Sequence, residues 1–154
     1  MKQPPGGPPR GTILAFDYGT RRIGVAVGDY IHATASALLT LNARNGVPLW
    51  NELDALVAEW QPVTLVVGIA RHADGNESTM ATLARAFAAT LEEKYALPVE
   101  LVDESLTSRA ADSELREQRR TGMLPRRVRP QDSDRIAARL ILEAWMFRRN
   151  HAPE

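Results

Sequence analysis

The hydrophobic positions of this 154-residue chain follow two kinds of pattern, short apolar runs and helical stripes. Apolar runs bounded by turn residues are typical of strands, and apolar spacing of three and four residues is typical of amphipathic helices. The runs predict five strands, at residues 12–16, 23–28, 34–41, 63–67 and 98–102. The stripes predict helices at residues 48–60, from 76 or 78 to 95, at 107–120 and at 132–148.

The order of these elements predicts an α/β fold. Three consecutive strands form an antiparallel meander, and the last two alternate with helices, which requires crossover connections. We therefore expect a central mixed five-stranded sheet with helices on both faces. The Pro- and Gly-dense residues 1–11 predict a disordered leader, followed by one domain over 12–149 and a tail at 150–154. Gly24 and Gly28 inside the second strand predict a close backbone approach there.

Composition and charge narrow the class of protein. The absence of cysteine excludes disulfides, thiolate zinc sites and a cysteine nucleophile. No apolar run approaches the roughly 18 residues of a transmembrane helix, so we expect no membrane association and a cytoplasmic location. The net charge is zero, yet residues 105–149 carry eleven arginines against six acids. That excess fits either a polyanion footprint or solvated helix faces.

Acidic residues stand where strands end and where the last helix begins. Asp17 ends the first predicted strand, Asp103 and Glu104 follow the last one, and Asp132 and Asp134 begin the final helix. Carboxylates without His or Cys suit Mg²⁺ or Mn²⁺, and two such ions can drive phosphodiester hydrolysis by water. Each acid also has a structural interpretation: a turn for Asp17, a solvated loop for 103–104, a helix N-cap for Asp132 and a helix-dipole contact for Asp134.

Four motifs, in order along the chain, resemble the YqgF/RuvX family. They are residues 15–28 (AFDYGTRRIGVAVG), 66–75, 102–107 (VDESLT) and 134–143, and the resemblance extends from residue 12 to about 147. It implies an RNase H-like fold and a nuclease that matures the 5′ end of pre-16S ribosomal RNA, or a Holliday junction resolvase. Ser105 stands where the family usually has arginine, Ala70 where proline is usual, and Asp132 adds an acid that could compete for the metal role.

The resemblance assigns roles residue by residue. It implies that Asp17, Glu104 and Asp134 are both the catalytic residues and the ligands of two Mg²⁺ or Mn²⁺ ions. Arg21 and Arg22 would clamp the scissile phosphate or merely neutralise Asp17. The remaining candidate nucleic-acid contacts are arginines of predicted loops and of the exposed helix: Arg71, Arg119, Arg120, Arg126, Arg127 and Arg129.

The expected partner is RNA, specifically precursor ribosomal RNA within an assembling particle, with branched DNA as the second candidate and a monomer or weak homodimer as the acting form. Three other functions stay open. One is a DNA junction resolvase that uses the same acids. Another is nucleotide phosphotransfer, because Asp17, Gly19 and Thr20 also resemble the phosphate-binding hairpin of actin-like ATPases. The third is a nucleic-acid-binding module without catalysis.

Overall fold

The protein is described here by a computed structural model, which covers residues 11–69, 79–103 and 130–151. Residues 1–10 of the predicted leader, residues 70–78, the predicted helix at 107–120 and residues 104–106 and 121–129 beside it lie outside these ranges. The six strands are β1 (Thr12–Asp17), β2 (Arg22–Asp29), β3 (Thr34–Arg44), β4 (Val47–Pro48), β5 (Thr64–Ile69) and β6 (Val99–Asp103). The described helices are α1 (Trp50–Trp60), α2 (Thr79–Tyr95) and α4 (Pro130–His151).

All six strands form one mixed sheet in the order β4-β3-β2-β1-β5-β6. The first three strands are the predicted antiparallel meander, and β5 and β6 join it parallel to β1. The central strands are buried because β1 and β5 are almost wholly apolar, as strands covered on both faces usually are. The α/β class and the mixed sheet are thus as the sequence predicts.

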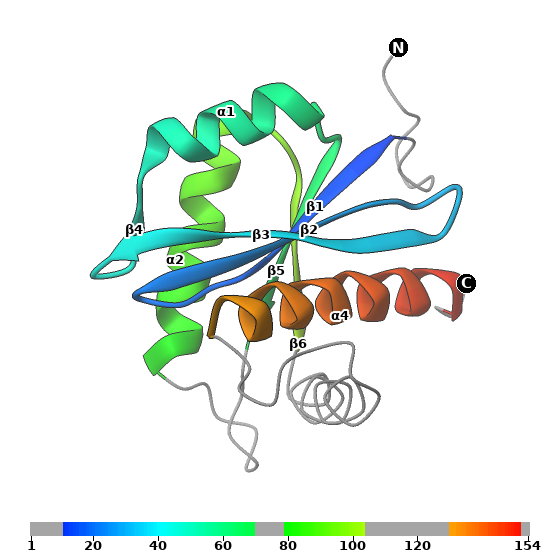
Figure 1. The fold of residues 1–154 in the computed structure, drawn as a ribbon. Helices are drawn as coiled ribbons and strands as arrows, with labels where there is room; N and C mark the ends of the chain where they lie inside the picture. The colour runs from blue at the N-terminus through cyan, green and yellow to red at the C-terminus, as the bar shows by residue number, and fades with distance from the viewer. Residues whose placement is uncertain (1–10, 70–78, 104–129, 152–154) are drawn as a thin grey trace.

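Helices cover both faces of this sheet (Figure 1). α1 and α2 pack on one face with the larger side chains of the central strands, among them Leu14, Phe16 and Val25. α4 lies across the other face, over Ile13 and Ala15. Among the described residues no helix is both long and apolar enough to cross a membrane.

Two details differ from the sequence predictions. The sheet has six strands instead of five, because Val47 and Pro48 pair with Arg44 and Ala43 as the short strand β4. Pro48 therefore belongs to a strand and does not begin the first helix, which starts at Trp50.

The start of the last helix was also misplaced. α4 begins at Pro130, two residues before the predicted start, so Asp132 lies inside its first turn. The interpretation of Asp132 as the helix N-cap was therefore wrong. Proline is favoured at the first helical position because its missing N–H would have no partner there, and that signal marks the true start.

Candidate active site

Asp17 ends β1 on the face of the sheet that α4 covers. Successive side chains of a strand point to opposite faces, and Ile13 and Ala15 pack beneath α4, so Asp17 shares their face. Because β1, β5 and β6 run parallel, Asp17 lies at the same sheet edge as Ile69 and Asp103, which end the other two strands. The carboxyl-terminal edge of parallel strands is where open α/β sheets usually bind ligands.

Asp134 reaches this edge from the far end of the sequence. Gly24 of β2 is the pairing partner of Asp17. The first turns of α4 cross Gly24 so closely that a Cβ there would lie 2.0 Å from the carbonyl oxygen of Asp134 and 2.9 Å from the amide nitrogen of Arg135. Only a residue without a side chain permits this approach, so the predicted role of Gly24 is confirmed. Asp17 and Asp134 are therefore both neighbours of one glycine.

Arg22 connects the hairpin to the helix. Its Nε donates a hydrogen bond of 2.8 Å to Oδ2 of Asp134. Arg22 and Gly24 point to the same face of β2, two residues apart, so this ion pair lies on the face of the sheet that Asp17 shares. The pair is partly exposed, with 36% of the Arg22 side chain accessible to solvent. The guanidinium thus contacts an acid of the candidate site, and that acid is Asp134.

The other predicted site residues are only partly accounted for. Arg21 is described and exposed. Glu104 lies outside the described residues, and so do Arg71, Arg119, Arg120, Arg126, Arg127 and Arg129. Within the described ranges, no three His, Cys, Asp or Glu side chains lie close enough together to hold a metal ion. The residue before Glu104 is Asp103 at the end of β6, and Val102 is buried beneath α4.

A contact that sequence reasoning missed braces the loop after Asp17. The hydroxyl of Tyr18 donates a 2.9 Å hydrogen bond to the carbonyl oxygen of Gly46, in the turn between β3 and β4. Gly46 returns a bond from its amide to the carbonyl of Thr20, at 2.9 Å. Burial raises the pKa of Tyr18 above its ordinary value. The sequence held one usable signal, the Asn45-Gly46 pair, which is typical of a tight turn.

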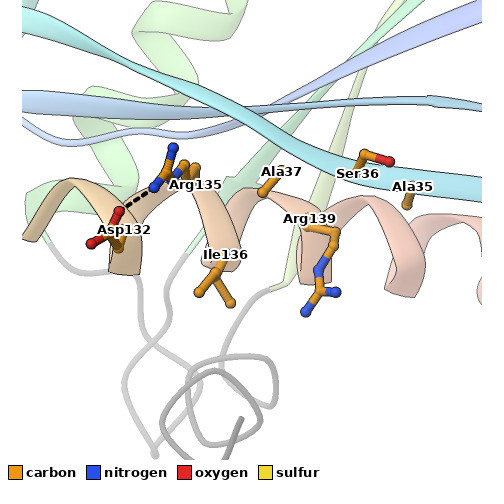
Figure 2. A pocket seen from close by; sticks show the side chains of 7 residues that line it. All are labelled: Ala35, Ser36, Ala37, Asp132, Arg135, Ile136 and Arg139. Carbon is orange, nitrogen blue, oxygen red and sulfur yellow. Dashed lines mark hydrogen bonds and ion pairs between the residues drawn. The ribbon is translucent and has the colours of Figure 1, made fainter. Parts of the chain in front are cut away.

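A polar hollow begins beside the same end of α4 (Figure 2). Its volume is about 390 Å³, and it is lined from β3 by Ala35, Ser36 and Ala37 and from α4 by Asp132, Arg135, Ile136 and Arg139. Asp132 is buried and forms an ion pair with the guanidinium of Arg135. The fold therefore supplies a buried carboxylate with a positive partner, which a charge removed from water requires.

Comparisons with known proteins agree with the family that the sequence motifs indicate. A family model described as RuvX, Holliday junction resolvase, matches residues 11–148. The chain belongs to the RuvX family. A RuvX relative from Saccharophagus degradans, named "Putative pre-16S rRNA nuclease", is 44% identical over 142 residues, which is 92% of this chain and 96% of the relative. One of the same name from Pseudomonas paraeruginosa is 46% identical over 135 residues, or 87% and 90% of the two chains. The predicted family and the expectation of a nuclease are confirmed.

Solved structures support the fold of this RuvX chain. RuvC of Thermus thermophilus, in complex with a Holliday junction substrate, superposes with a TM-score of 0.56 at 14% identity, covering 94% of this chain and 99% of its own. The yeast mitochondrial Holliday junction resolvase Ydc2 gives a TM-score of 0.51 at 14% identity, covering 90% and 78% of the two chains. At such low identity the likeness concerns the fold, and it confirms the expected RNase H-like architecture.

Proposed function

We propose that this RuvX chain is a divalent-metal-dependent nuclease that matures the 5′ end of pre-16S ribosomal RNA, with Asp17, Glu104 and Asp134 as its catalytic and metal-binding residues. The observation that supports this most is the meeting of Asp17 and Asp134 at Gly24, since 117 positions of sequence separate them. Relatives named pre-16S rRNA nuclease support the choice of RNA. A DNA endonuclease of the junction-resolving type is the second candidate, because the family model carries that description.

The donor set fits hard divalent ions. Asp17 and Asp134 offer carboxylate oxygens, the ligands that Mg²⁺ and Mn²⁺ prefer. Arg22 holds a positive charge 2.8 Å from Oδ2 of Asp134, so the site accommodates a cationic group at that oxygen. Glu104, directly after the end of β6, would supply the third carboxylate. When bound, two such ions would activate a water molecule and stabilise the oxygen that leaves phosphorus.

The protein's own groups would orient the substrate. Asp17 is fixed at the end of a buried strand, and Asp134 is fixed by a helix packed against Gly24, so neither carboxylate needs to be ordered when the substrate binds. Arg22 keeps further N–H donors beyond the one that Asp134 accepts, and these can contact a phosphate oxygen. The arginines at 119–129 would contact the backbone of the nucleic acid and contribute affinity that falls with salt.

The test is cleavage of matched RNA and DNA substrates, each in Mg²⁺ and in Mn²⁺, by the wild type and by Asp17→Asn. We expect the wild type to cut the RNA, and the variant to lose at least about 100-fold in rate while it keeps its melting temperature and RNA affinity. Asp29→Asn is the matched control, since Asp29 stands at the opposite end of the same hairpin, paired with Thr12. Undiminished cleavage by Asp17→Asn would refute the proposal, and cleavage of DNA alone would favour the junction-resolving alternative.

A further inference from the structure

The hollow between β3 and α4 lies next to the candidate active site, and the proposed nuclease reaction does not use it. Asp132, which lines its near end, is two residues from Asp134. Asp132, Arg135, Ile136 and Arg139 recur at helical spacing, so they form one face of α4, and this face lines the hollow together with β3. The hollow therefore starts where the acidic site ends and continues along the helix.

The strand side of the hollow is open because its side chains are small. Ala35, Ser36 and Ala37 leave space over β3, and the last two are exposed. The outer edge of β3 adds backbone groups: within the described part of the chain, β4 pairs only with Ala43 and Arg44 of that edge. An unpaired strand edge presents N–H donors at every second residue.

The helix side carries two guanidinium groups one turn apart, about 6 Å along the axis. Arg135 is held by its ion pair with buried Asp132, and Nε of Arg139 lies 3.9 Å from a carboxylate oxygen of Glu143. A guanidinium has five N–H donors, and one carboxylate uses at most two of them. The ion pair with Asp132 therefore holds Arg135 in place, and neither pair can use all the N–H donors of its guanidinium.

We propose that this hollow binds the phosphodiester backbone of the nucleic-acid strand as it leaves the acidic site, with Arg135, Arg139 and the β3 edge as donors. Figure 2 shows Ala35 and Ala37 on the strand above the α4 turns that carry the two arginines, while the Ser36 side chain points away from the helix. The inference rests on the proposed function only for the direction of the bound nucleic acid. The nucleic acid passes the first turn of α4 and continues along Ala37 and Ala35. The hollow reads no base, because its polar groups suit phosphates and sugars.

The test is binding of a fluorescently labelled single-stranded RNA and a DNA of the same sequence, measured by anisotropy in EDTA, where no cleavage occurs. Ala37→Glu places a carboxylate in the hollow at an exposed position, and we expect it to weaken binding about tenfold. Ala55→Glu adds the same charge to an exposed position of α1, on the other face of the sheet, and should bind as the wild type does. Arg139→Ala should weaken binding severalfold and lower the slope of log Kd against log salt by about 0.7 to 0.9, whereas Arg139→Lys should keep the slope.

These binding measurements test the hollow independently of the proposed nuclease activity. If Ala37→Glu and Arg139→Ala are folded, by unchanged melting temperature, and bind both probes as the wild type does, the hollow is not a nucleic-acid site, whatever Asp17→Asn does to cleavage. If Ala37→Glu does not fold, Arg139→Ala and its salt slope decide alone. Weakened binding by these variants, together with undiminished cleavage by Asp17→Asn, would keep the hollow as a binding site and refute the catalytic assignment.

Discussion

The two faces of the sheet are built from different kinds of side chain. Under α1 and α2 the strands carry large residues, and Phe87 of α2 contacts three aromatic rings there, with centroid distances of 5.8 Å to Phe16, 4.9 Å to Tyr18 and 6.4 Å to Trp50. Under α4 the strands β1 and β2 carry Ile13 and, beyond it, mostly small or charged residues, listed in chain order as Ala15, Asp17, Arg22, Gly24, Ala26 and Gly28. Large side chains fill the space beneath α1 and α2, and the small residues on the other face let the backbone of α4 approach the strands.

This difference explains why the chemistry lies on one face. A helix that packs on large side chains is held away from the strand backbone by those side chains. At Gly24 the backbone of α4 touches the strand, and that contact brings residue 134 close to the end of β1, where Asp17 stands. Both faces hold a buried apolar core, and the α4 face also provides the geometry of the candidate site.

The strongest way to break this arrangement is Gly24→Ala. A Cβ 2.0 Å from the Asp134 carbonyl oxygen must displace α4, because its position is set by the strand and the atom that it meets belongs to the helix backbone. We expect unfolding to become easier by about 3 kcal/mol, in the range of overpacked cores, and cleavage to fall at least about 100-fold, because a shift of 1 Å at a reacting centre has that effect. Urea unfolding and single-turnover cleavage measure the two effects. Wild-type cleavage by this variant would show that the approach of α4 at Gly24 does not position the site.

The opposite face should respond in stability alone. Phe87→Ala removes the ring that joins Phe16, Tyr18 and Trp50, and a buried phenylalanine lost in this way lowers the free energy of unfolding by about 3–5 kcal/mol. At a temperature where the variant is fully folded, its cleavage rate should remain within about threefold of wild type. A far larger loss of rate, with the protein still folded, would show that the packing under α1 and α2 also determines the geometry of the candidate site.

The features that could be predicted from the sequence are those that depend on residues close together in the chain. The strands at 12–16 and 63–67 were predictable because their apolar runs report burial on both faces, which is a local property. Gly24 was predictable as a point of close approach, since a glycine costs stability in a strand unless something needs its space. What approaches it, the backbone of α4, is more than a hundred residues away and leaves no mark near Gly24.

The elements that sequence reasoning missed are those with short or competing signals. β4 has two residues, too few to show any alternation. The start of α4 was misplaced because Pro130 ends a segment rich in Pro, Gly and Arg, which resembles a loop, although proline also suits a first helical turn. The sequence left Arg22 as a phosphate clamp or as the partner of nearby Asp17, while the fold pairs Arg22 with Asp134, 112 residues away.

The contact between Tyr18 and Gly46 links the two faces of the sheet. Tyr18 packs against Phe87 among the aromatic rings under α2, and it directly follows Asp17 in the chain. Gly46 has a φ of +81°, and a Cβ there would lie 2.2 Å from the Tyr18 hydroxyl oxygen. Gly46→Ala should therefore cost about 1–2 kcal/mol in stability from backbone strain and displace that hydroxyl. Tyr18→Phe keeps the ring and loses only the hydrogen bond, for about 1 kcal/mol.

If the contact positions Asp17, both variants should lower the cleavage rate severalfold at saturating substrate, leave the KM for RNA unchanged and raise the Mn²⁺ concentration needed for half-maximal rate. Unchanged rate and metal dependence would assign the contact to stability only. The pH dependence gives an independent check, since burial raises the pKa of Tyr18. The folded chain keeps this hydroxyl protonated where the unfolded chain loses its proton, near pH ~10. Its contribution to stability is thus complete below that pH and lost above it, so the stability gap between wild type and Tyr18→Phe should narrow as the pH rises from about 9 to about 11.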